Sequence, residues 1–178
     1  MKELTKPGMS TKTLVIVALF IALSFIGSYL KIFGTIAFDS LPAFLAALLL
    51  GPVHGAAIGF LGHLFTAITS GFPMSVPMHI VIAATMALTM LGFGYTYKAL
   101  VKRVSVTGVL VLTGGVGVLL NGPVSLAFSI GMMTVLIGSE AALGLIALLP
   151  ILTIAAAINV ILSIILYKSL GSLWNKII

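Results

Sequence analysis

Apolar runs of about 20 residues recur along the whole chain, and they constrain its fold more than any other feature of the sequence. Only 7% of the 178 residues are charged and 61% are hydrophobic, whereas soluble domains carry about 25% charged residues. Runs of this length suit helices that cross a bilayer, where every backbone polar group must be bonded internally. The sequence therefore predicts an all-α integral membrane protein, with residues 1–178 forming a single membrane domain.

Six apolar segments are separated by turn residues and short charged loops. A basic leader over residues 1–12 precedes six predicted transmembrane helices, which cover about 13–31, 36–50, 53–69, 76–97, 106–133 and 141–167. The second and third helices are short and meet at Gly51-Pro52, which indicates a tight hairpin that either spans the membrane or re-enters it. Asn121-Gly122-Pro123 interrupts the fifth helix, and its proline predicts a kink or an unwound turn.

The cations are distributed unevenly between the two predicted sides of the membrane. With six spans, the side that holds both termini collects eight of the nine cations: Lys2, Lys6, Lys12, Lys98, Lys102, Arg103, Lys168 and Lys176. The other side carries Lys31, Asp39 and Glu140. The positive-inside rule then predicts a multi-pass protein of a prokaryotic cell membrane with both termini in the cytoplasm. Because lipid and topology explain these cations, they do not indicate a nucleic-acid partner.

The segment Phe38–His79 contains all three histidines, one of the three acids and four of the seven prolines. Ionisable groups are costly in hydrocarbon, so those that a membrane chain keeps often serve a function. Polar candidates from several helices fall in the outer half or at the midplane: Asp39, His63, His79, Asn121, Ser125 and Glu140. Apolar walls are expected from Phe38, Phe72, Phe128, Met132 and Met133. We expect one outward-facing pocket for a small molecule.

Each polar candidate also has a purely structural interpretation. Asp39 lies near the start of the second predicted helix and Glu140 directly precedes the sixth, so each could serve as a helix cap. The histidines of the third and fourth helices could be packing or interfacial residues. Asn121 is the stronger candidate, because a buried amide must find partners. Asn159, in the inner half of the last helix, is interpreted as a hydrogen-bonding link between helices.

The sequence contains no cysteine, so disulfides, thiol nucleophiles and thiolate metal sites are excluded. It has no His-x-x-x-His pair and no Walker-type glycine-rich loop, so the chain is not expected to hydrolyse ATP itself. We therefore expect a transport subunit rather than an enzyme, with no cofactor and no metal. A membrane enzyme that uses His63, His79 and Glu140, and a stand-alone carrier or channel, remain as alternatives.

Three stretches carry a resemblance to a known family. They are A-L-F-I-A-L-S from Ala18, L-P-A-F-L-A-A-L-L-L-G-P-V-H-G-A-A-I-G from Leu41 and G-F-P-M-S-V-P-M-H from Gly71. With them the chain resembles, over essentially its whole length, the substrate-binding S components of energy-coupling-factor (ECF) vitamin transporters. The resemblance implies a subunit that captures a vitamin or vitamin precursor from outside. It also implies docking through Ala18 and Ala22 on a transmembrane coupling protein, with two cytoplasmic ATPases supplying energy.

The hairpin and the G-F-P-x-x-x-P-x-H loop are most similar to the subgroup assigned to α-ribazole, a precursor of cobalamin. Phenylalanine and methionine walls would suit its flat ring system, and acids or amides could bind ribose hydroxyls. The same residues would suit thiamine-like or pyrimidine precursors, riboflavin or pantothenate, so the substrate stays open. Asp39 and Glu140 favour a neutral or cationic ligand over a carboxylate.

Overall fold

The computed structural model describes residues 10–32, 36–73 and 75–177 of the chain. Most of the predicted basic leader, residues 1–9, lies outside the described residues. Helices dominate the structure, as the composition predicts. Their bounds, with those of one short ribbon, are α1 Thr11–Tyr29, β1 Lys31–Ile32, β2 Ile36–Ala37, α2 Leu41–Leu49, α3 Pro52–Thr69, α4 Val76–Leu100, α5 Val106–Leu119, a π-helical segment Leu120–Val124, α6 Ser125–Ile137, α7 Ser139–Leu143, a 3₁₀ segment Gly144–Leu148 and α8 Leu149–Ile177.

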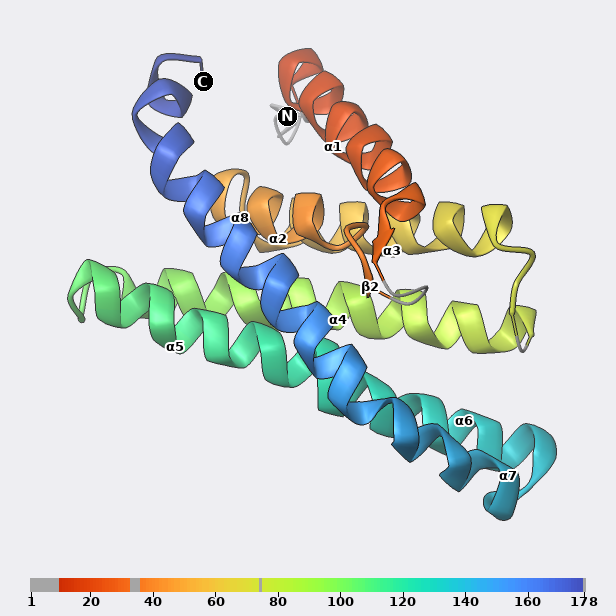
Figure 1. Cartoon of the computed structure of the whole chain (residues 1–178). Coiled ribbons are helices and arrows are strands. Elements are labelled where there is room, and N and C mark those ends of the chain that lie inside the picture. Colours follow the sequence, from red (N-terminus) through yellow and green to blue (C-terminus); the bar gives the residue numbers. More distant parts are fainter. Residues whose placement is uncertain (1–9, 33–35, 74, 178) are drawn as a thin grey trace, which may run out of the picture.

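The helices form a layered bundle (Figure 1). In this view α3 and α4 run side by side in opposite directions, and α5 continues through the π segment into α6 beside α4. α8 crosses the bundle diagonally and packs on α2, α5 and the π segment. α1 packs on α2 and α3. The arrangement brings α3, α4, α6 and α8 around the middle of the molecule, where the candidate site lies.

The short helix α2 is the most completely buried element. Seven of its nine residues are buried, from Pro42 to Leu48. Phe44 is fully buried and meets Phe93 of α4 edge to face, with the ring centroids 4.9 Å apart. Because lipid chains are as apolar as these side chains, close packing rather than transfer from water holds such helices together. A helix with no polar side chain after its first residues suits this central position.

Four helical stretches are long and apolar enough to cross a membrane: Thr11–Tyr29, Val76–Leu100, Val106–Ile137 and Gly144–Gly171. This supports the membrane class that the sequence predicts. α2 and α3 are not among them, and six spans are not confirmed. The nine residues of α2 cover only ~14 Å, against a hydrocarbon core of about 30 Å.

The turn between α2 and α3 falls at Gly51-Pro52, as predicted. Gly51 has a φ of 101°, a value that side chains with a Cβ rarely adopt. Pro52 then begins α3, where its missing N–H costs nothing. The turn lies beside Lys98 of α4, because a Cβ built on Gly51 would come 3.2 Å from the lysine Nζ.

Two glycines of α3, Gly55 and Gly62, let neighbouring helices approach closely. A Cβ on Gly55 would lie 2.8 Å from the Cα of Ala47, and one on Gly62 would lie 2.7 Å from the Cβ of Ser24. Glycine is therefore required at these two contacts for α3 to pack on α2 and α1.

The predicted helix over residues 36–50 begins five residues later, at Leu41. Ile36 and Ala37 instead pair with the residues after α1, Ala37 opposite Lys31 and Ile36 opposite Ile32. Ser40 occupies the N-cap position of α2, but its side chain makes no capping hydrogen bond. Proline at the second position of the helix sets its start, because proline favours the first turn.

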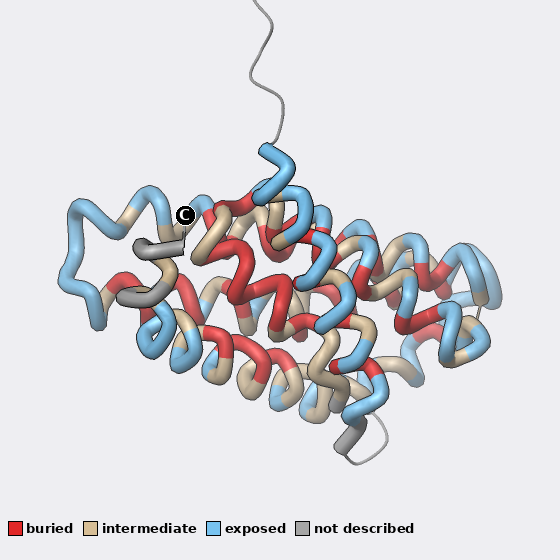
Figure 2. The backbone as a smooth tube through the Cα atoms, turned by 90° about the horizontal axis from the view of Figure 1, so that it is seen from above, coloured by how far each residue is buried: buried red, intermediate tan, exposed pale blue. Residues whose placement is uncertain are grey.

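The later helices also extend beyond their predicted ends. α4 ends at Leu100 and α6 at Ile137, and α8 continues to Ile177. At Asn121-Gly122-Pro123 the chain passes through a π turn, which is wound more loosely than an α-helix, and then continues into α6. The predicted irregularity therefore occurs here without ending the helix. A π turn accommodates an extra residue and tolerates the missing proline N–H. Figure 2 shows the buried segments gathered in the middle of the bundle, with exposed segments at its ends and outer faces.

Candidate functional site

A cavity of about 270 Å³ lies among α3, α4, the π segment, α6 and α8. Its polar lining consists of Asp39, Ser40, His63, Thr66, Asn121, Ser125, Ser129 and Asn159. The rest of its wall is formed by Ala37, Ile82, Met86, Gly122, Leu126, Leu152, Ala155 and Ala156. Small-molecule sites are typically mostly apolar cavities with a few convergent polar groups. This cavity is therefore the candidate binding site.

The cavity gathers four of the polar residues that the sequence singles out: Asp39, His63, Asn121 and Ser125. They come from the loop before α2, from α3, from the π segment and from the first residue of α6. His79 of α4 is not part of the lining but forms a hydrogen bond with His63. Four of the six polar candidates thus line one cavity, and a fifth, His79, contacts one of these four.

The π segment positions Asn121 at the cavity. Gly122 packs directly on α8, since a Cβ there would lie 3.1 Å from the Cα of Thr153. A π turn rotates the following helix relative to a regular α-helix, and such turns occur frequently at functional sites. Asn121 in the π segment and Ser125 directly after it both line the cavity.

Asp39, His63 and His79 form a linear array that ends on the backbone. His79 Nε2 lies 2.9 Å from the Pro73 carbonyl oxygen, and His79 Nδ1 lies 3.1 Å from His63 Nε2. The two imidazole rings are stacked, with centroids 5.3 Å apart. At the other end of the array, His63 Nδ1 lies 3.8 Å from Asp39 Oδ2. The array runs from the loop after α3 to the cavity.

Three hydroxyl groups of the lining already donate their hydrogens inside the protein. Thr66 donates to the Gly62 carbonyl, at 3.0 Å, and Ser129 donates to the Ser125 carbonyl, at 3.0 Å. The Thr85 hydroxyl lies 2.8 Å from the Ile82 carbonyl and 2.9 Å from the Ser125 hydroxyl, so with Thr85 donating to the carbonyl the second contact uses the hydrogen of Ser125. While these internal bonds are kept, the three hydroxyl groups offer lone pairs to a ligand.

Asn159 of α8 has a double role that the sequence does not predict. Its Nδ2 donates to the Ala37 carbonyl and to the Ala155 carbonyl, each at 2.9 Å. The first bond links α8 to the β2 strand, in agreement with a linking role. Asn159 also lines the cavity, and its Oδ1 has no hydrogen-bond partner. The sequence signal was an amide within an otherwise apolar helix, but its depth and neighbours depend on the fold.

The predicted aromatic wall lies outside the cavity. Phe38 borders a groove with residues of α1 such as Phe20, and Phe72 packs on the outer side of His79, with centroids 5.8 Å apart. Phe128 is 54% exposed on α6. The methionines Met132 and Met133 belong to a separate cluster with Met78 and Ala142. The cavity lining described above contains no phenylalanine, and Met86 is its methionine.

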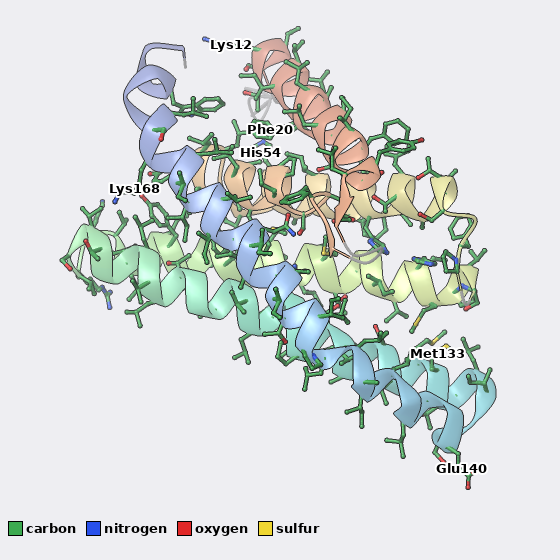
Figure 3. All side chains as sticks on the ribbon, viewed as in Figure 1. Lys12, Phe20, His54, Met133, Glu140 and Lys168 are labelled. Carbon is green, nitrogen blue, oxygen red and sulfur yellow. The ribbon has the colours of Figure 1, made fainter. Side chains whose placement is uncertain are left out.

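Glu140 also lies away from the cavity. It is exposed in the first turn of α7, a position that suits a carboxylate near a helix N-terminus. Figure 3 shows Glu140 at the end of the bundle opposite to Lys12 and Lys168. The acid and these two cations therefore occupy opposite ends of the molecule.

Ala18 and Ala22 are both exposed on α1, and the exposed Leu19 and Leu23 lie beside them. Val17, Phe20 and Ser24 are the buried residues in this part of the helix. The two alanines therefore lie on the part of α1 that no other described element covers.

A family model for the substrate-specific component of ECF transporters matches residues 12–171. No curated protein and no solved structure matches the chain at a significant level. Members of this family are substrate-binding components of transporters rather than enzymes. The match extends from the first turn of α1 to the last turns of α8 and so includes every element that lines the cavity. We conclude that the chain belongs to the family of ECF transporter substrate-specific components.

Proposed function

We propose that this subunit captures a vitamin or vitamin precursor from the outer side of a prokaryotic cell membrane and holds it in the cavity between α3, α4, α6 and α8. The observation that carries the proposal is the convergence of eight polar side chains on one cavity inside an otherwise apolar bundle. Polar groups at membrane depth are costly, and a ligand that pairs with them accounts for their presence. The ECF family match supports the same reading.

We propose α-ribazole as the first substrate to test. The support is the similarity of the hairpin and of the G-F-P-x-x-x-P-x-H loop to that subgroup, together with a lining rich in hydrogen-bond acceptors for ribose hydroxyls. The aliphatic wall, with Ile82, Met86 and Leu126, suits a flat apolar ring system. Thiamine-like precursors, riboflavin and pantothenate are the other candidates.

We propose that the partners are a transmembrane coupling protein and two cytoplasmic ATPases, and that the coupling protein docks on Ala18 and Ala22. Small residues on an exposed helix face allow a second helix to approach closely. The exposure of both alanines supports this role. The membership of the chain in a family of ECF components supports association with such a module.

We propose an orientation with both termini in the cytoplasm. The support is the charge distribution, since Lys12 and Lys168 lie at one end of the bundle and Glu140 at the other. Lys98 lies beside the α2–α3 turn, which would then also face the cytoplasm. Cations concentrate on the cytoplasmic side of membrane proteins.

The test is identification of small molecules released from the detergent-purified, denatured protein by mass spectrometry, followed by titration calorimetry with the best candidate. We expect a vitamin or precursor that binds one molecule per chain. α-Ribazole would support the substrate assignment, and another vitamin would replace it while leaving the transport role in place. Absence of binding to every member of a vitamin panel would contradict the proposed function.

A further inference from the structure

We propose that Asp39 and His63 form a pair of hydrogen-bond acceptors that recognises a ligand group carrying two donor hydrogens, such as a vicinal diol or an amino group. The proposal rests on the proposed function, because it assumes that a ligand occupies the cavity. It goes further in stating which chemical group the ligand presents and where this group lies. A carboxylate or a carbonyl oxygen is excluded from the same position.

The direction of the hydrogen bonds follows from the carbonyl group at the end of the array. A carbonyl oxygen can only accept, so the Nε2 of His79, 2.9 Å from the Pro73 oxygen, carries a hydrogen. A neutral imidazole has one hydrogen, so His79 Nδ1 carries a lone pair and accepts from His63 Nε2 at 3.1 Å. The hydrogen of neutral His63 is then on Nε2, and its Nδ1 is an acceptor.

The second acceptor is the Asp39 carboxylate. Its Oδ2 lies 3.8 Å from His63 Nδ1, which is too far for a direct hydrogen bond. Both side chains line the cavity, and they are 13% and 12% exposed. Two largely buried acceptors that face each other, such as Asp39 Oδ2 and His63 Nδ1, are unfavourable unless a hydrogen-bond donor lies between them. Donor atoms placed at about 2.9 Å from each acceptor satisfy both.

The rest of the lining points to the same ligand chemistry. With their hydrogens directed to groups inside the protein, the hydroxyls of Thr66, Ser125 and Ser129 offer lone pairs to the cavity. Together with Asp39, His63 and the Asn159 Oδ1 they give a lining with several acceptors. The Asn121 amide and the Ser40 hydroxyl can donate, so an accepting atom of the ligand would lie beside them and not between Asp39 and His63.

The experiment combines substitutions with ligand analogues. α-Ribazole, its 2′,3′-dideoxy analogue and thiamine are titrated into the wild-type protein and into Asp39→Asn and His63→Gln. His54→Gln is the matched control, because His54 lies on the same helix but bonds to the Leu50 carbonyl and does not line the cavity. We expect Asp39→Asn and His63→Gln to weaken binding of the recognised ligand at least tenfold and His54→Gln to leave it unchanged. If the ligand is α-ribazole, the wild type should bind the dideoxy analogue at least tenfold more weakly than α-ribazole. Either variant should bind the two compounds with nearly the same affinity.

The outcomes separate the two proposals. Suppose that α-ribazole binds and that removal of the diol lowers the affinity of the variants by the same factor as that of the wild type. This result would overturn the acceptor pair for a diol, but it would leave the proposed function intact. Binding of thiamine, but not α-ribazole, with the same sensitivity to Asp39→Asn and His63→Gln would assign the pair to an amino group.

A measurement without ligand tests the same inference. The protein contains three histidines, so ring ¹⁵N resonances of histidine-labelled protein can be assigned with the single variants. In the neutral rings of His63 and His79 we expect the hydrogen on Nε2, with Nδ1 unprotonated in both. A hydrogen on Nδ1 of neutral His63 would overturn the proposal even if no ligand were known.

Discussion

Asp39 precedes a helix whose capping position it does not occupy. Ser40 stands at the N-cap of α2, and Asp39 is left free to line the cavity beside His63. The sequence offers capping and ligand binding as two interpretations of this carboxylate. Because α2 begins at Leu41, its N-cap position falls on Ser40 and not on Asp39. The capping interpretation of Asp39 is therefore not realised in the structure. The residue at which α2 starts therefore decides that Asp39 contributes to the cavity and not to the helix cap.

Among the amide side chains that line the cavity, Asn121 is the one whose substitution we expect to weaken ligand binding most directly. Replacement by alanine removes a lining amide from the π segment. We expect Asn121→Ala to weaken ligand binding by about 1–3 kcal/mol, because a ligand group would lose its partner in a buried site. Titration calorimetry measures this loss, and helical content from circular dichroism should remain that of the wild type. An unchanged affinity would remove Asn121 from the binding site.

At the scale of elements, the π segment determines how α6 and α8 meet. Gly122 contacts α8 so closely that a Cβ there would lie 3.1 Å from the Cα of Thr153, and a larger side chain would require the two segments to move apart. The segment also carries Asn121 and leads directly to Ser125, both of which line the cavity. The π segment thus places one polar residue, Asn121, at the cavity and one glycine, Gly122, at the contact with α8.

Gly122→Leu should separate α8 from the π segment. We expect the variant to lose about 1–3 kcal/mol of stability, as overpacking commonly costs, and to bind ligand at least tenfold more weakly. Gly131→Leu is the matched control, because a Cβ at Gly131 meets no atom within 4 Å. Thermal unfolding in detergent and calorimetry measure the two effects. Equal behaviour of the two variants would show that the contact with Thr153 is not needed for the site.

The exposed face of α1 is the other element with a testable role. We expect Ala18→Trp combined with Ala22→Trp to abolish assembly with the coupling protein, because bulky side chains prevent close approach of a second helix. Ligand binding to the isolated subunit should be unaffected, since neither alanine lines the cavity. Val135→Trp, at a position of α6 that is 82% exposed, is the control. Co-purification of the complex after both substitutions would contradict docking at this face.

At the scale of the whole molecule, the charges and the apolar faces define an axis through the bundle. Lys12 and Lys168 lie at one end and Glu140 at the other. Large apolar side chains such as Val106 and Val111 are 73% and 67% exposed, as expected where lipid rather than water surrounds the chain. The cavity lies between these ends, among helices that are long enough to cross a bilayer.

The absence of cysteine from the sequence makes this axis directly measurable. We expect Glu140→Cys to react with a membrane-impermeant maleimide in intact cells, and Lys102→Cys to react only after permeabilisation. Val53→Cys, exposed at the start of α3, should behave like Lys102→Cys if the α2–α3 turn faces the cytoplasm. Labelling of Val53→Cys in intact cells would contradict this placement of the hairpin. A reversed pattern for the other two variants would contradict the proposed orientation.

Much of the fold could be predicted from the sequence because its signals are local. The length of the apolar runs specifies membrane helices, and Gly51-Pro52 specifies a turn within two residues. Ser75 caps α4 by a local contact of this kind, with its hydroxyl accepting from the Met78 N–H. The number of spans is harder to predict, because a fully buried helix such as α2 can be apolar without being long enough to cross.

The candidate site could be predicted only in part. Asp39, His63 and Asn121 were recognisable as polar residues in apolar surroundings, and the structure gathers them at one cavity. Phe128 was expected in the wall on the basis of its position along α6, but successive residues of a helix point about 100° apart. Its side chain consequently lies on the outer face, 54% exposed.

The sequence by itself determined the membrane class of the protein and the turn between α2 and α3, because hydrophobicity, proline and glycine act within a few residues. The tertiary structure alone decided which polar groups meet. Asn159 bonds to the carbonyl of Ala37, 122 residues away, and His63 of α3 lies 3.1 Å from His79 of α4. Such contacts depend on the packing of whole helices, whose relative rotation is not encoded in any single segment.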